Sequence, residues 1–147
     1  EGFFIKSGRR HTRGSYVTGV QTWLFRSVDT ETTSLNEMQA ELVGISLSVK
    51  AGEACYIPLT HKANAADDLF GGAELAENQL SLNVALDALT PMLRDPSILK
   101  IGQNMKYDTK IFAGLGIDVA PIDDTMLMSY AMHGGLHNHG MDGLSER

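Results

Sequence analysis

The sequence has little cysteine, little positive charge and no long apolar run. Its single cysteine, Cys55, cannot form a disulfide within the chain, which fits a reducing, cytoplasmic compartment. No stretch reaches the roughly 18 consecutive apolar residues of a membrane-spanning helix. Acidic residues outnumber basic ones by 18 to 12, and the net charge of -6 argues against a protein that binds nucleic acid by simple electrostatics. With 147 residues, the chain is long enough for one domain with its own core.

The N-terminal segment differs from the remainder in charge and in pattern. Residues 1–27 contain five basic residues and one acid, and they show no sustained helical or strand period. The string SGRRHTRGSYVTGVQTWLFRS, residues 7–27, resembles a translated sequencing-library adapter. On this interpretation residues 1–27 are a non-native, unstructured leader and the fold begins at residue 28. A basic arm that binds nucleic acid is the alternative, and a secretory signal is not expected because the apolar residues precede the basic ones.

From residue 28 onward, periodicity predicts a mixture of strands and helices. Three short segments with alternating apolar residues predict an antiparallel meander, and the remaining segments alternate between helix and strand. That order is typical of an α/β domain with a mixed sheet flanked by helices. The expected strands are 28–31, 41–49, 54–59, 97–102 and 117–122; the expected helices are 75–93, 105–115 (capped by Asn104), 123–133 and one from 141, with a loop over 60–72.

Two acidic sites lie at positions where their side chains can meet. Asp29 and Glu31 alternate along a predicted strand and therefore share a face, which is costly unless they are solvated or a positive group lies between them. Asp108 lies one turn into the helix that follows strand 97–102. Three converging carboxylates suit Mg²⁺ or Mn²⁺, and such sites carry out two-metal hydrolysis of phosphodiesters. A solvated acidic pair at a strand end is the simpler alternative.

A histidine-rich string, HGGLHNHG, follows the helix expected over 123–133. It contains His133, His137 and His139, and imidazoles at such short spacing are candidate ligands for a transition metal. The glycines between them favour a solvated loop instead. We therefore expect no metal site at these three histidines.

The strings VDTETTSL and KIGQNMKYD resemble the first two motifs of the 3′–5′ proofreading exonuclease domain of bacterial DNA polymerase I. That domain belongs to the DEDD exonuclease superfamily, which has a ribonuclease H-like fold. The strings ELVGISLSVKAGEACYIPLTH, DDTMLMSYAM and MDGLSER are also similar, so the resemblance covers residues 28–147. It implies a ribonuclease H-like sheet, with a three-stranded antiparallel meander followed by parallel strands, in a partial domain that is incomplete at its C-terminus.

The resemblance also implies roles for seven residues. Asp29 and Glu31 would ligate one Mg²⁺ or Mn²⁺ ion, and Asp29 would bridge to a second ion that Asp108 holds largely through water. Thr32 and Leu35 would contact the terminal nucleotide, with Leu35 as a wedge beside the last base. Asn104 and Tyr107 would hold the 3′ end of single-stranded or frayed DNA. The expected context is a monomeric bacterial chain in the cytoplasm, in which a polymerase domain of the parent protein supplies most of the grip on DNA.

One departure from the family pattern concerns its third motif, in which a tyrosine precedes the final aspartate by four residues. No Tyr-x-x-x-Asp follows Asp108, because Tyr130 is followed four residues later by Gly134. The water-orienting phenol and the fourth carboxylate are therefore missing, and we expect weak or no activity from this chain. Two other functions stay open: a ribonuclease D-like RNA 3′ exonuclease, and a catalytically inactive module that supports a polymerase domain.

Overall fold

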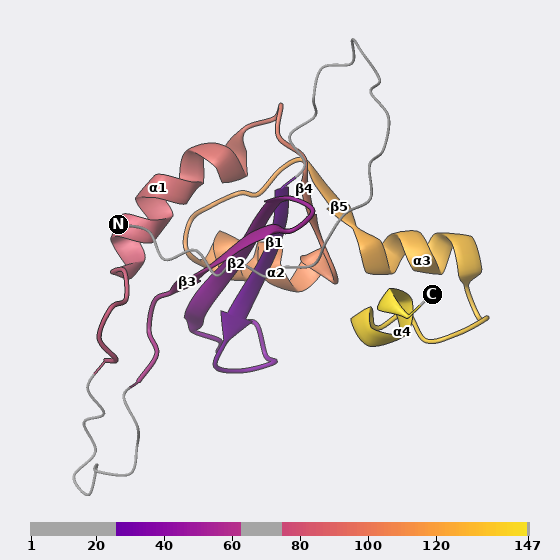
Figure 1. Cartoon of the computed structure of the whole chain (residues 1–147), viewed down its shortest axis with the longest axis horizontal. Coiled ribbons are helices and arrows are strands. Elements are labelled where there is room, and N and C mark those ends of the chain that lie inside the picture. Colours follow the sequence, from indigo (N-terminus) through magenta and orange to yellow (C-terminus); the bar gives the residue numbers. More distant parts are fainter. Residues whose placement is uncertain (1–25, 63–74, 147) are drawn as a thin grey trace, which may run out of the picture.

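The structure, a computed structural model, describes residues 26–62 and 75–146. A five-stranded mixed sheet forms the centre of the chain, and α2 lies across it (Figure 1). The helix α1 lies at one end of the view, and α3 and α4 lie at the other, beyond β5. The elements are β1 (Arg26–Thr32), β2 (Leu42–Lys50), β3 (Glu53–Pro58), α1 (Leu82–Arg94), β4 (Lys100–Gly102), α2 (Met105–Gly114), β5 (Ile122–Asp124), α3 (Thr125–His133) and α4 (Met141–Ser145).

The sheet has the strand order β3-β2-β1-β4-β5, which confirms the predicted architecture. The first three strands form an antiparallel meander, and β4 and β5 continue the sheet in parallel with β1. Parallel neighbours require crossover connections, and α1 and α2 provide them. This topology places the carboxyl end of β1 beside the start of α2, where the two acidic motifs meet.

One face of the meander is apolar and the other is polar, as strand alternation requires. On the apolar face, Val28 pairs with Leu47 and Thr30 pairs with Ile45, which in turn pairs with Ile57 of β3. Buried side chains of α1 and α2 join these residues in one core; the helical members are Ala85, Leu93, Ile111 and Phe112. The opposite face carries the row that contains Asp29. The two faces of β1 therefore differ: one packs against the helices, and the other carries Asp29 and Glu31.

The close packing of β4 against β1 requires a glycine at position 102. A Cβ built on Gly102 would lie 2.3 Å from Met105 Sδ and 2.7 Å from the carbonyl oxygen of Val28. Both distances are shorter than real Cβ contacts, and the second involves backbone that cannot move aside easily. This glycine therefore fixes how closely the GQNMKYD segment approaches β1.

The helix predicted over residues 75–93 begins later than its leucine spacing indicates. Asn78 has a φ of 63°, outside the helical range, and α1 starts only at Leu82. Ser81 supplies the N-cap, because its hydroxyl accepts a hydrogen bond from the Val84 N–H at 3.4 Å. The helix ends at Arg94, one residue past the predicted end at residue 93, and it contains Pro91.

The strand predicted over residues 117–122 is also displaced, since β5 covers only Ile122–Asp124. Ile117 and Val119 are buried in the core cluster without forming a strand, so burial and not pairing explains their apolar character. The strand predicted over 97–102 is shortened to β4 in the same way.

Residues 1–25 of the predicted leader and most of the predicted loop at 60–72 lie outside the described residues, and the leader stays a prediction. Its last two residues, Arg26 and Ser27, begin β1 and pair with β4. Among the helices that the structure describes, none is long and apolar enough to cross a membrane.

Candidate active site

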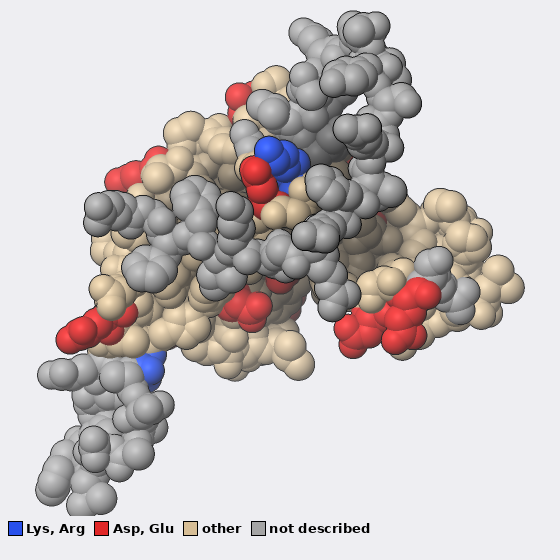
Figure 2. Space-filling view, viewed as in Figure 1, with Lys and Arg blue, Asp and Glu red and all other residues tan. Residues whose placement is uncertain are grey.

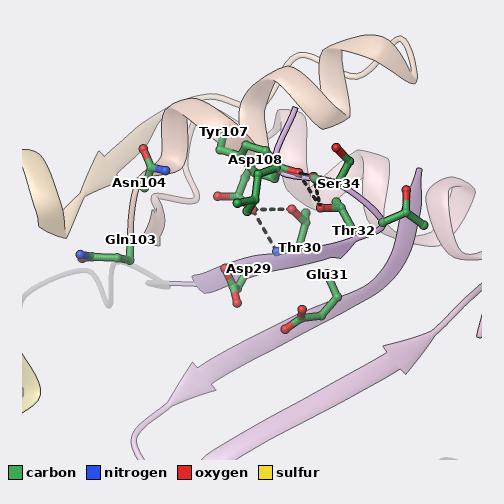
Figure 3. A pocket seen from close by; sticks show the side chains of 11 residues that line it. Asp29, Thr30, Glu31, Thr32, Ser34, Gln103, Asn104, Tyr107 and Asp108 are labelled. Atoms are coloured by element: carbon green, nitrogen blue, oxygen red, sulfur yellow. Dashed lines mark hydrogen bonds between the residues drawn. The ribbon is translucent and has the colours of Figure 1, made fainter. Parts of the chain in front are cut away.

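The carboxyl end of β1, the loop that follows it and the start of α2 enclose a cleft of about 430 Å³ (Figure 3). Every residue that the sequence proposed for the site lines this cleft. The lining consists of Asp29, Thr30, Glu31, Thr32, Thr33, Ser34, Leu35, Gln103, Asn104, Tyr107 and Asp108. Segments far apart in the chain thus meet as the motif spacing predicts.

Asp108 is the most firmly held of the three carboxylates. It is only 3% exposed, and its Oδ1 accepts two hydrogen bonds from Thr30, one from the backbone N–H at 2.9 Å and one from the hydroxyl at 2.6 Å. Burial raises the pKa of Asp108 above its ordinary value, the Thr30 bonds oppose that rise, and the nearby Asp29 charge adds to it. Thr30, which the sequence reasoning missed, therefore orients Asp108 across the strand.

Asp29 and Glu31 lie on the other side of β1 from Thr30 and Asp108 (Figure 3). Asp29 is half-buried, and this desolvation raises its pKa, with partial compensation from the backbone of Thr30. Glu31 is exposed. The negative charge of Asp29 contributes to the raised pKa of Asp108, so the two carboxylates lie within electrostatic reach of each other.

The predicted convergence of three carboxylates is only partly realised. All three line one cleft, but among residues 26–62 and 75–146 no group of three His, Cys, Asp or Glu side chains is close enough to hold a metal ion together. The three-carboxylate metal site therefore stays a prediction. Its donor set, carboxylate and hydroxyl oxygens, is of the type that Mg²⁺ and Mn²⁺ prefer.

Tyr107 ties the loop after β1 to α2. Its hydroxyl donates a hydrogen bond to the carbonyl oxygen of Ser34 and is also hydrogen-bonded to the hydroxyl of Thr32. Thr32 Oγ1 also lies 3.1 Å from the same carbonyl oxygen, so the two hydroxyl protons are shared among three close contacts. Leu35, one residue further along, is 96% exposed and projects from this anchored loop. An apolar side chain presented in this way is available to a ligand.

Asn104 occupies the N-cap position of α2 but does not cap it. Its backbone is left-handed, with φ 59° and ψ 43°, and its side chain makes no capping hydrogen bond. The backbone N–H of Asn104 donates instead to Asp124 Oδ1 at 3.0 Å, and the same oxygen caps α3 by accepting from Met126 and Leu127. The Asn104 side chain is thereby exposed at the cleft, and the expectation of a side-chain cap was wrong.

The histidine-rich string is less solvated than expected. His139 is 4% exposed; its Nδ1 is hydrogen-bonded to Ser129 Oγ at 2.7 Å, and its ring packs on Tyr130 at a centroid distance of 3.8 Å. Burial lowers the pKa of His139, and the neighbouring histidines add to the effect. His133 is exposed and His137 is partly exposed. No metal-binding group of three forms here in the described part of the chain.

Positive charge does not gather around the described face of the molecule. In Figure 2, acidic side chains are spread over several places, and basic ones are sparse among the atoms that are not grey. On α2, Lys110 is engaged in a salt bridge with Glu37, which lowers the pKa of that carboxyl. Among the described residues, the lining of the cleft contains carboxylate, hydroxyl and amide groups and no lysine or arginine.

Comparison with known proteins agrees with this geometry. A family described as 3′–5′ exonuclease matches residues 26–147. A DNA polymerase I from Rhizobium leguminosarum is 48% identical over 128 residues, which cover 81% of this chain and 12% of that protein. The chain thus spans about an eighth of the length of that relative.

Two solved structures show the same fold at low identity. Brucella melitensis NrnC with bound Mg²⁺ has a TM-score of 0.62 and 21% identity, over 85% of this chain and 53% of that one. Escherichia coli RNase D, an exoribonuclease involved in structured RNA processing, has a TM-score of 0.57 and 19% identity, over 84% and 27%. The sheet is thus of the ribonuclease H-like exonuclease type. By fold and sequence, the chain belongs to the 3′–5′ exonuclease domain family of bacterial DNA polymerase I.

Proposed function

We propose that this chain removes nucleotides from the 3′ end of single-stranded or frayed DNA by hydrolysing the terminal phosphodiester. The observation that carries the proposal is the meeting of Asp29, Glu31 and Asp108 in one cleft of a chain from this family. Because this chain spans about an eighth of a DNA polymerase I relative, we propose that its parent protein also contains a polymerase domain that grips duplex DNA. A monomeric state and a cytoplasmic location are part of the same proposal.

We infer that the carboxylates hold two divalent cations, Mg²⁺ or Mn²⁺. The donor chemistry fits, since the cleft presents carboxylate oxygens and the raised pKa values of Asp29 and Asp108 indicate charges that a cation would stabilise. When bound, such cations supply Lewis-acid stabilisation of the attacking and leaving oxygens. Asp29 would serve both ions, Glu31 one of them, and Asp108 the other.

Four residues are proposed to position the DNA end. Leu35 projects from the loop and would wedge beside the last base, a contact that is blind to sequence. Thr32 and Tyr107 hold the shape of that loop through their shared hydrogen bond and would contact the terminal nucleotide and the strand behind it. Asn104 presents an uncommitted amide at the cleft, where it can bond to the sugar or a base.

DNA is favoured over RNA as the substrate. The alternative of a ribonuclease D-like RNA exonuclease has support from the fold, but the likeness to RNase D is 19% in sequence. The polymerase relative is 48% identical. A catalytically inactive module is disfavoured because Asp29, Glu31 and Asp108 are all present.

A direct test uses the purified chain in excess over a 5′-labelled single-stranded DNA oligonucleotide with Mg²⁺ or Mn²⁺. We expect slow, stepwise shortening from the 3′ end, slow because no Tyr-x-x-x-Asp follows Asp108. Asp29→Ala and chelator should each abolish it, whereas Asp87→Ala, on the exposed side of α1, should not. If the oligonucleotide stays intact, the chain is extended at its C-terminus with a segment that carries the Tyr-x-x-x-Asp motif. A folded, extended chain that still leaves the oligonucleotide intact contradicts the proposal, and faster loss from a matched RNA favours the alternative.

A further inference from the structure

The polar face of the meander carries two cross-strand rows next to the cleft. In the first row Asp29 pairs with Ser46, which pairs with Tyr56; in the second, Glu31 pairs with Gly44, which pairs with Pro58. Directly paired residues have their side chains on the same face of a sheet. Tyr56 of β3 therefore shares a face with the two strand carboxylates, although the cleft itself is built from β1 and α2.

Gly44 leaves the space between the rows open, and the ring of Tyr56 fills it. A Cβ on Gly44 would lie 2.0 Å from Tyr56 Oη and 2.3 Å from its Cζ. The ring thus leans diagonally over β2, so that its hydroxyl lies above the direct partner of Glu31. In agreement with this placement, burial raises the pKa of Tyr56 and the charge of Glu31 adds to the rise.

The hydroxyl of Tyr56 is fixed by His61, which lies in the segment after β3. Tyr56 Oη and His61 Nε2 lie 2.6 Å apart, and the two rings meet edge to face with centroids at 5.7 Å. The backbone of His61 is clamped by Gln79, whose Oε1 accepts from the His61 N–H at 2.6 Å and whose Nε2 donates to its carbonyl at 2.9 Å. The pair is therefore held on two sides and cannot swing freely.

We propose that Tyr56 and His61 are a positioning pair for Glu31, which orients its carboxylate for a divalent cation in the cleft. In this arrangement His61 Nε2–H donates to Tyr56 Oη, and the phenol O–H is left to donate to Glu31. A hydrogen bond of this kind fixes the orientation of an otherwise exposed ligand, as outer groups do at metal sites generally. The inference rests on the proposed function, since it assigns to Glu31 the role of a metal ligand.

The test measures Mn²⁺ affinity of the full chain by electron paramagnetic resonance of free Mn²⁺, which requires no turnover. Tyr56→Phe keeps the ring over Gly44 and removes only the hydroxyl; we expect it to weaken Mn²⁺ binding about 10-fold. His61→Ala should do the same, and the double variant should lose no more than either alone, because both act through one contact. Tyr130→Phe is the matched control, since its ring packs on His139 outside the cleft lining.

Three outcomes separate this inference from the function on which it depends. Weaker Mn²⁺ binding in Tyr56→Phe and in His61→Ala supports the pair, provided that Tyr130→Phe binds Mn²⁺ as the wild type does and that the melting temperatures from circular dichroism are unchanged. Wild-type affinity in Tyr56→Phe, together with weakened binding in Glu31→Gln, overturns the pair and leaves the metal site intact. Unchanged affinity in both Glu31→Gln and Asp29→Asn overturns the metal site, and the positioning role falls with it.

Discussion

Replacing Thr30 by valine tests whether the buried face of β1 holds the site together. The substitution keeps the shape and β-branching of the side chain but removes the hydroxyl that donates to Asp108 Oδ1 at 2.6 Å. The backbone bond to the same oxygen, at 2.9 Å, is retained. Asp108 is 3% exposed, so water cannot readily replace the lost donor. Hydrogen bonds to charged groups contribute roughly 1.5–3 kcal/mol, and we expect the free energy of unfolding to fall by about 2 kcal/mol at neutral pH.

The same argument gives the pH dependence a definite sign. Burial raises the pKa of Asp108 above its ordinary value of 3.8, so the native state keeps a proton that the unfolded state has already released. Stability therefore falls as the pH rises through the interval above 3.8, until the native carboxyl has also ionised. The Thr30 hydroxyl favours the ionised form of Asp108. Its removal therefore raises the native pKa of Asp108 further, which widens the pH interval and enlarges the fall in the free energy of unfolding. The cost of Thr30→Val should thus shrink to about 1 kcal/mol in acid, where only a neutral hydrogen bond is lost.

Urea unfolding at neutral and at mildly acidic pH measures both the stability lost in Thr30→Val and its pH dependence. A chelator is included so that metal binding does not contribute. Thr90→Val is the matched control, since its hydroxyl donates to the Leu86 carbonyl within α1 and touches no carboxylate. In an Asp108→Asn background, Thr30→Val should cost no more than about 1 kcal/mol, because the charge is gone. Equal losses for Thr30→Val and Thr90→Val, or a cost that does not change with pH, would refute the reasoning.

Two further predictions concern β4, which connects the cleft to the core. Gly102→Ala should lower the free energy of unfolding by about 1–3 kcal/mol, because the new methyl overlaps Met105 Sδ and the Val28 carbonyl; an unchanged melting temperature would contradict this. Lys100 is fully buried, and its Nζ donates to three backbone carbonyls. Lys100→Met leaves those carbonyls without that donor and should lower the free energy of unfolding, measured in urea, by at least about 2 kcal/mol. An unchanged free energy of unfolding would contradict this prediction.

The sequence was sufficient to predict features that depend on local periodicity. Alternation placed Asp29 and Glu31 on one face of a strand, and the structure has them on β1, opposite the packed face. The meander and the helix that carries Asp108 were predicted to within one or two residues for the same reason. These features follow from side-chain period and turn residues, which any single segment displays by itself.

Features that depend on two distant segments were not predictable in this way. Asn104 is a residue type that often caps helices with its side chain. Here its backbone N–H donates to Asp124 instead, and Asp124 lies next to it only because β5 runs parallel to β4. The start of α1 likewise depends on a distant segment, because the residues before it bond to the chain after β3: Gln79 to the backbone of His61, and the Leu80 N–H to the Pro58 carbonyl. The contact between Thr30 and Asp108 was not predicted, because a threonine between two acidic residues matches no motif that indicates such a role.

The two faces of β1 explain why the site should respond to changes outside it. Thr30 points to the helices and holds Asp108, while Asp29 and Glu31, its neighbours in sequence, point to the face that Tyr56 shares. A shift of β1 would move Asp29 and Glu31 directly, and it would move Asp108 of α2 only through the two hydrogen bonds that Thr30 donates to its carboxylate. Substitutions at Thr30 should therefore weaken metal binding through Asp108, and substitutions at Tyr56 through Glu31. Since the two routes start on opposite faces and share no contact, their effects on Mn²⁺ affinity should multiply when combined.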